Sequence, residues 1–194
     1  MKHASRPNGS ALVVAVLILS IAAPDDARAQ RFPGFGGIEV RGGVADMEDV
    51  DNGLNYAFDL DIGYLFTPAL RTYLRFEGFR GDLEFNGGGE LHGSGLETGV
   101  RYDFLTSFFL SPYGVVGVNV SHIRNFDVSD QTAPALPDGY FTSFVYGAGA
   151  ALHIGQRLAI TADVRRLTGD RDVERTFFTL GVRFQPKGLD TYKP

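Results

Sequence analysis

The sequence predicts an all-β fold, namely an eight-stranded antiparallel up-and-down transmembrane β-barrel. Three observations indicate it: apolar and polar residues alternate in eight stretches, the links between these stretches alternate between long and short, and the bulkiest side chains share the apolar face. A period of two is typical of strands with two different faces. A closed barrel leaves no exposed edge, and strands of about 9–11 residues are long enough to cross a bilayer.

Each alternating stretch is expected to form one strand with a polar face and an apolar face. In the second stretch, Tyr56 and Phe58 begin a continuous apolar face, whereas Asp59 and Asp61 lie on the opposite face. The eight stretches lie near 35–45, 54–66, 69–80, 91–105, 110–124, 140–155, 157–167 and 175–185.

The links between the stretches differ in length and composition. Those predicted to be long are 46–53, 81–90, 125–139 and 168–174, and those predicted to be short are centred on 67–68, 106–107 and 155–156. Since the two kinds alternate along the chain, a meander would place all long links at one end of the barrel, which is the usual plan of outer-membrane barrels. The long links are acidic and contain Asp46, Glu48, Asp49, Asp51, Asp82, Glu84, Glu90, Asp127, Asp130, Asp138, Asp170, Asp172 and Glu174.

Residues 1–29 have the features of a cleaved secretory signal peptide. Lys2 and Arg6 precede an apolar run over residues 11–23, and Ala27 and Ala29 provide a small-x-small cleavage site. We expect cleavage after Ala29. A membrane anchor is the alternative, although a spanning helix needs about 20 apolar residues.

Composition argues against several classes of function. The 194-residue chain is 44% apolar and 21% charged, as expected for one folded domain, and it has no cysteine, so neither a disulfide nor a thiolate metal site is available. The net charge of −5 gives no support to nucleic-acid binding. After residue 29, lysine occurs only at Lys187 and Lys193, whereas a soluble surface normally uses lysine freely.

Side-chain size indicates which face lies inside. An eight-stranded barrel has room for only a single close-packed filling of side chains. Small residues occupy the polar face at Gly43, Gly63, Gly99, Gly117, Gly147 and Gly149. Bulky residues occupy the apolar face at Phe58, Tyr64, Leu74, Phe76, Tyr102, Phe104, Tyr146, Phe178 and Phe184. We therefore predict that the polar face lines the interior and that the bulky residues lie outside, against lipid.

The polar face carries charges of both signs in nearly equal number. The planar guanidinium of arginine suits enclosed pairing with carboxylates, and an unpaired buried charge costs several kcal/mol. We therefore predict a lumen network of ion pairs between seven acids and six arginines: Glu39, Arg41, Asp59, Asp61, Arg71, Arg75, Glu77, Glu97, Arg101, Asp103, Asp163, Arg165 and Arg183. A soluble secreted barrel with these charges in bulk water is the alternative.

A shared pattern runs through residues 64–81, 111–123, 147–170 and 176–186. Pro-Tyr opens a Gly-spaced strand, and a Gly-x-Gly strand, a tight turn, an Arg/Asp strand and a final Thr-Leu-Gly-Val-x-Phe strand follow. This pattern resembles the small Gram-negative outer-membrane β-barrel domains, namely the OmpA-like, OmpX-like and opacity-type surface proteins, over essentially the whole mature chain.

The resemblance implies an outer-membrane barrel over residues 30–186, followed by a short periplasmic tail at 187–194. It also implies insertion by the outer-membrane barrel assembly machinery, periplasmic termini and extracellular long loops. The last strand is similar to the insertion signal of that family, which assigns this role to Phe178, Leu180, Val182 and Phe184.

No catalytic, cofactor-binding or metal site is predicted. Some eight-stranded outer-membrane proteins modify lipid A, and such chemistry needs a serine, a histidine and a carboxylate close together. The best candidates, Ser121 and His122, fail because adjacent residues of a strand point to opposite faces. The acidic loops could hold Ca²⁺ or Mg²⁺, but solvated loops are the simpler interpretation.

We expect a monomeric outer-membrane protein with a charge-filled lumen and acidic surface loops, whose role is structural or surface-exposed. Outer-membrane lipid, lipopolysaccharide and the assembly machinery are the expected partners. A narrow porin or ion channel is the first alternative, because one ion pair that exchanges partners could open a path. An adhesin and a lipid-modifying enzyme are the others.

Overall fold

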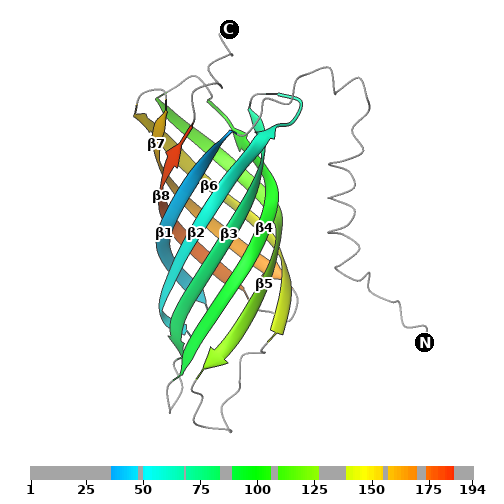
Figure 1. Ribbon diagram of the computed structural model, residues 1–194, viewed down its shortest axis with the longest axis vertical. Helices are drawn as coiled ribbons and strands as arrows, with labels where there is room; N and C mark the ends of the chain where they lie inside the picture. The colour runs from blue at the N-terminus through cyan, green and yellow to red at the C-terminus, as the bar shows by residue number, and fades with distance from the viewer. Residues whose placement is uncertain are drawn as a thin grey trace, which may run out of the picture. The chain divides into compact units, whose positions relative to one another are not determined.

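The structure is a computed structural model that describes residues 36–47, 50–67, 69–83, 89–105, 109–126, 139–154, 157–169 and 174–185. Its strands are β1 (Gly37–Met47), β2 (Val50–Tyr64), β3 (Leu70–Leu83), β4 (Glu90–Asp103), β5 (Leu110–Phe126), β6 (Gly139–Ile154), β7 (Leu158–Gly169) and β8 (Arg175–Phe184). They form a closed antiparallel barrel in which each strand pairs with the next and β8 pairs with β1 (Figure 1). The predicted eight-stranded fold is therefore confirmed. The expected signal peptide 1–29 and tail 187–194 lie outside the described residues.

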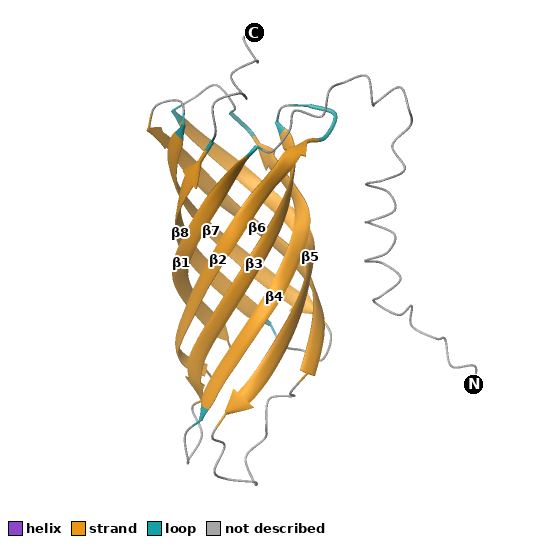
Figure 2. Ribbon diagram, viewed as in Figure 1, coloured by secondary structure: helices purple, strands orange, loops and turns teal. Residues whose placement is uncertain are grey.

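The barrel has two distinct ends. β1 begins and β8 ends at the upper end in Figure 2, where Ile38 pairs with Phe184, and we call this the turn end. At the opposite end β5 ends at Phe126 and β6 begins at Gly139, and we call this the loop end. In the described part of the chain, no helix has the length and apolar character needed to cross a membrane.

The strands reach further toward the loop end than the sequence predicted. Most of the predicted link 46–53 belongs to β1 and β2, which are joined at residues 48–49. A register shift between Val44 and Met47 accompanies this hairpin. The prediction was wrong because acidic residues such as Asp46 were interpreted as loop. Antiparallel strands accept polar side chains on a solvated face, so polarity alone does not end a strand.

Side chains alternate between the interior and the outer face of the barrel, as the period of two predicts. On the outer face, Phe58, Phe76 and Phe178 are 38%, 48% and 46% exposed. On the interior face, Arg75 and Glu97 are fully buried. The apolar face therefore lies outside and the charged face lies inside.

Interior glycines allow large rings to lie across neighbouring strands. The Tyr73 hydroxyl lies over Gly99 and Gly117, where an added Cβ would be 2.9 and 3.0 Å from it. The Phe79 ring covers Gly93 in the same way, at 1.9 Å from an added Cβ. The expectation that the bulky residues lie outside was therefore incomplete, because these rings fill the interior space that the glycines leave.

Replacing Gly99 with alanine should lower the free energy of unfolding by about 1–3 kcal/mol, the usual cost of overpacking. The added Cβ would lie 2.2 Å from the Val116 carbonyl oxygen and 2.7 Å from the Gly117 Cα, and neither backbone atom can move aside freely. Gly42→Ala is the control, because nothing lies within 4 Å of its Cβ position. Urea unfolding of the refolded proteins compares them, and equal stability of the two variants would contradict the close approach at Gly99.

Candidate functional site

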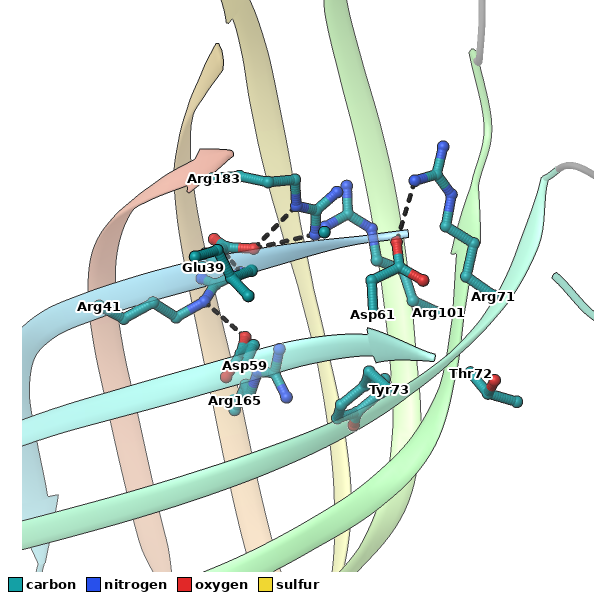
Figure 3. A pocket seen from close by; sticks show the side chains of 12 residues that line it. Glu39, Arg41, Asp59, Asp61, Arg71, Thr72, Tyr73, Arg101, Arg165 and Arg183 are labelled. Carbon is teal, nitrogen blue, oxygen red and sulfur yellow. Dashed lines mark hydrogen bonds and ion pairs between the residues drawn. The ribbon is translucent and has the colours of Figure 1, made fainter. Parts of the chain in front are cut away.

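The barrel interior contains all the residues of the lumen network. All of them are buried except Arg71 at the turn end, whose side chain is 13% exposed. Figure 3 shows the members near the turn end, which converge from different strands. The alternation of the strands places them on one face, and closure of the sheet brings their side chains together.

Asp163 on β7 contacts side chains from four other strands, the most distant being Arg75 on β3, whose Nη2 lies 3.8 Å from Oδ2. Its Oδ2 contacts Arg41 Nη1 at 2.8 Å and Arg165 Nε at 3.1 Å, and it accepts a hydrogen bond from the Tyr113 hydroxyl at 3.2 Å. Thr179 donates to Oδ1 at 2.5 Å. This carboxylate therefore connects β1, β3, β5 and β8 to β7 through the centre of the barrel.

Arg41 on β1 joins this group to two further carboxylates. It donates from Nε to Asp59 at 2.9 Å and contacts Glu39 through Nη2 at 2.6 Å. Arg75 donates from Nε and Nη2 to the two oxygens of Asp59, at 2.7 and 2.9 Å. Arg183 contacts Glu39 through Nη2 at 2.9 Å. The pairs consequently form one connected network rather than separate salt bridges.

Another group of pairs lies at the turn end. Arg71 contacts Asp61 and Asp103, each at 3.1 Å, and Arg101 contacts Asp103 through Nη2 at 2.6 Å. The Arg101 guanidinium also lies 3.5 Å from the centre of the Tyr113 ring. Stacking of this kind is favourable for a planar cation, so the Tyr113 ring stabilises the charge of Arg101.

The network ends deeper in the barrel at two glutamates. Glu97 pairs with Arg165 and accepts a hydrogen bond from the Tyr73 hydroxyl at 2.7 Å. Glu77 accepts a hydrogen bond from Asn119 at 2.9 Å. Within the described residues, Glu77 forms no ion pair.

Arg175 on β8 is a buried interior charge that the sequence analysis missed. Its Nη2 donates to Ser121 Oγ at 2.9 Å, and its guanidinium lies 5.1 Å from the centre of the Phe79 ring. Among the described residues the interior then holds seven carboxylates and seven arginines. The sequence does contain a signal for this placement, because Arg175 lies an even number of residues from Arg183 and therefore on the same face of the strand. Arg175 was left out of the predicted network because it is the first residue of the predicted stretch 175–185.

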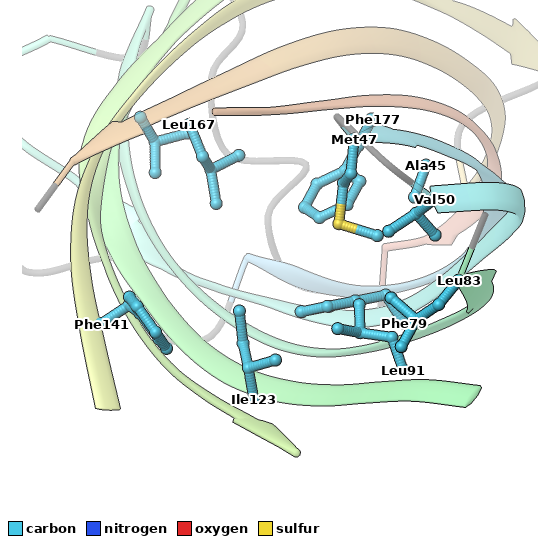
Figure 4. Packing of buried hydrophobic residues seen from close by; sticks show 11 residues of the cluster. Ala45, Met47, Val50, Phe79, Leu83, Leu91, Ile123, Phe141, Leu167 and Phe177 are labelled. Carbon is cyan, nitrogen blue, oxygen red and sulfur yellow. The ribbon is translucent and has the colours of Figure 1, made fainter. Parts of the chain in front are cut away.

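An apolar layer lines the interior on the side of the loop end (Figure 4). All eight strands contribute to it, and its side chains point into the barrel. The sequence analysis did not predict this layer. Its members are Ala45, Met47, Val50, Phe79, Leu83, Leu91, Ile123, Phe141, Val145, Leu167 and Phe177.

Free space in the network is small. A cavity of about 20 Å³ lies at the turn end, lined by network residues such as Glu39, Asp61 and Arg101. This volume holds about one water molecule. At this place the ion pairs of the described residues therefore leave room for little more than one water molecule.

The described residues provide no arrangement for nucleophilic catalysis around His122. Ser121 is buried in the interior, whereas His122 lies on the outer face with its ring 4.6 Å from that of Tyr140. Ser94 lies opposite His122 in the β4–β5 register. Among the hydrogen bonds of the described residues, none joins either serine to the histidine. In the same residues no group of three His, Cys, Asp or Glu side chains could hold a metal ion.

The residues assigned to the insertion signal lie along the outer face of β8. Phe178, Leu180, Val182 and Phe184 are 46%, 66%, 52% and 44% exposed. β8 closes the barrel between β7 and β1. Their use as a signal stays a prediction.

The acidic residues of the predicted long links fall into two groups. Asp46, Asp51, Asp82 and Glu90 are exposed in strands, and Glu174 pairs with Arg166 beside β8. The others lie outside the described residues: Glu48, Asp49, Glu84, Asp127, Asp130, Asp138, Asp170 and Asp172.

Residues 11–185 match the family described as outer membrane protein beta-barrel domain. The chain belongs to this family. Membership places the protein in the Gram-negative outer membrane, so the alternative of a soluble secreted barrel is excluded. A comparison with curated proteins finds no match.

Solved outer-membrane barrels share the fold. Ail, the attachment invasion locus protein of Yersinia pestis, is 17% identical with a TM-score of 0.54, over 79% of this chain and 99% of that chain. Neisserial surface protein A is 14% identical with a TM-score of 0.53, over 78% and 96%. OprG from Pseudomonas aeruginosa is 13% identical with a TM-score of 0.52, over 80% and 100%. At these identities the likeness supports the fold alone.

In this outer-membrane barrel, Asp163→Asn should lower the free energy of unfolding by about 3–5 kcal/mol, because it leaves buried arginines without their carboxylate. Glu174→Gln is the matched control. It removes an acid from the Arg166 pair, whose side chains are 49% and 55% exposed, and exposed pairs contribute little. Urea unfolding in lipid vesicles measures both variants. Unfolding of Asp163→Asn at the same urea concentration as Glu174→Gln would contradict a stabilising role of the Asp163 ion pairs.

Proposed function

We propose that the protein is a closed, monomeric outer-membrane barrel with a structural or surface-exposed role, rather than a channel. The observation that carries this proposal is that two successive layers of side chains point into the interior. The apolar layer receives side chains from every strand, and the ion pairs beyond it leave a cavity of about 20 Å³.

Each layer opposes conduction for its own reason. A solute that crosses the lumen network would have to break contacts shared by several carboxylates and arginines, such as those around Arg41 and Asp163. An ion that reached the apolar layer would lose its hydration without gaining polar partners, which is costly. Because both layers oppose the passage of ions through the lumen, they support a structural role for the protein rather than a channel role.

The proposed orientation places the loop end outside the cell and both termini in the periplasm. Short turns on the periplasmic side and longer loops outside are the common plan of outer-membrane barrels. The longest stretch of sequence between two consecutive strands, residues 127–138, separates β5 from β6, and these strands end and begin at the loop end. Outer-membrane lipid and lipopolysaccharide would surround the apolar outer face, and the barrel assembly machinery would insert the chain.

A planar bilayer that contains the refolded protein should show no stepwise conductance in concentrated KCl. Both interior layers would have to rearrange for an ion to pass. Insertion is verified on the same sample by the heat-dependent mobility shift that folded barrels show on gels. Uniform conductance steps would overturn the closed-barrel proposal, and Arg75→Ala compared with Arg166→Ala would then test whether the interior pairs form the gate.

Cysteine labelling should place the link 127–138 outside the cell. The native chain has no cysteine, so Ala133→Cys and Thr67→Cys each introduce a single thiol, in the 127–138 link and in the β2–β3 link. A membrane-impermeant maleimide added to intact cells should label Ala133→Cys and should label Thr67→Cys only after the outer membrane is permeabilised. The reverse pattern would reject the proposed orientation.

A further inference from the structure

Three basic side chains form one row across the outer face of the barrel near the loop end. Arg80 on β3 lies opposite His92 on β4, and His92 lies opposite Arg124 on β5. All three are exposed. Directly opposed residues of antiparallel strands have Cβ atoms about 4.5–5.5 Å apart, so the long side chains of this basic row can reach a common anion.

The rows on the turn side of the basic row indicate its depth in the membrane. The adjacent row contains Ser94, His122 and Tyr140, and the ring of Tyr140 is 76% exposed. The next row contains Phe76 and Leu96, both exposed apolar residues. An apolar band bordered by aromatic residues marks the membrane boundary of outer-membrane barrels. The basic row therefore lies just beyond the hydrocarbon, at the level of lipid headgroups.

The two arginines of the row have charges that no carboxylate of the described chain neutralises. Neither Arg80 nor Arg124 forms an ion pair in those residues, whereas Arg166, another outward arginine, pairs with Glu174. Glu90 holds the His92 ring at 3.0 Å from its Oε2. Arg80 and Arg124 thus flank a fixed imidazole and remain available to a ligand.

We propose that the basic row binds phosphate groups of the outer-leaflet glycolipid, the lipid A portion of lipopolysaccharide. Guanidinium groups bind phosphate through paired, charge-assisted hydrogen bonds. Asp82 and Glu90, which face each other one row further toward the loop end, repel an anion there and so confine the phosphate to the row. The inference rests on the proposed orientation, since the reverse orientation would set the row against periplasmic-leaflet phospholipid.

Binding of lipid A to the refolded protein in uncharged detergent micelles tests the proposal. The wild type should bind diphosphorylated lipid A more tightly than dephosphorylated lipid A, and added salt should weaken the phosphate-dependent part. Arg80→Gln combined with Arg124→Gln should weaken binding of the diphosphorylated form by at least about tenfold. Arg166→Gln, the matched control on the outer face of β7, should bind as the wild type does.

The proposal would be overturned by a wild type that does not distinguish the two lipid A forms, or by a double variant that binds as tightly as the control. Folding of each variant is verified by its heat-dependent mobility shift, so loss of binding cannot come from loss of the barrel. A parallel measurement uses micelles that contain phosphatidylglycerol. Equal affinity for this phospholipid would overturn the assignment to glycolipid. The orientation is tested separately by cysteine labelling, and the closed barrel is tested separately by the conductance measurement, so failure of either proposal can be told apart from failure of lipid binding.

Discussion

Electrostatic compensation inside a closed barrel is the constraint on which the rest of this structure depends. Eight strands enclose too little space for bulk water, so a guanidinium or carboxylate that points inward must find its counter-charge among the other side chains. The described interior holds seven carboxylates and seven arginines, and all of them except Glu77 and Arg175 form ion pairs there. The absence of lysine from the strands follows from the same condition, since a planar, multidentate cation can serve several carboxylates at once, as Arg41 does.

The interior changes character along the barrel axis, and the outer face changes with it. Ion pairs occupy the side of the turn end, and aromatic and aliphatic side chains occupy the side of the loop end. On the outer face, apolar residues such as Phe76 give way near the loop end to Tyr140 and then to charged side chains such as Arg80. The wall is therefore matched to lipid outside, while the filling inside provides rigidity and closure.

Local sequence pattern was enough to predict the strands, the closed fold and the direction in which the faces point. The two-residue period and the near balance of charge carried that information, and Phe58 and Asp59 lie on the faces expected of them. Depth along the axis was not predictable in the same way. Phe79 shares a face with Arg75 and Glu77, and alternation alone cannot tell that a residue two positions further on lies in an apolar layer.

Partner choice was also beyond the sequence. Arg41 contacts Asp59 on the adjacent strand and Asp163 near the other end of the chain, and the second contact exists only because β8 closes the ring between β7 and β1. The extension of β1 to Met47 and the start of β2 at Val50 were missed for a related reason. The backbone pairing of these two strands outweighs the polarity of side chains such as Asp46.

The distribution of charge among the strands has a consequence for assembly. The interior faces of β1 to β7 carry seven carboxylates but only five arginines, and β8 adds Arg175 and Arg183 without any acid. A sheet that lacks its final strand is left with two surplus negative charges facing its concave side, and the arrival of β8 neutralises them. Pairing of β8 with β7 and β1 is thus favoured by electrostatic attraction as well as by hydrogen bonding. Among the described strands, only β8 carries two more interior arginines than interior acids.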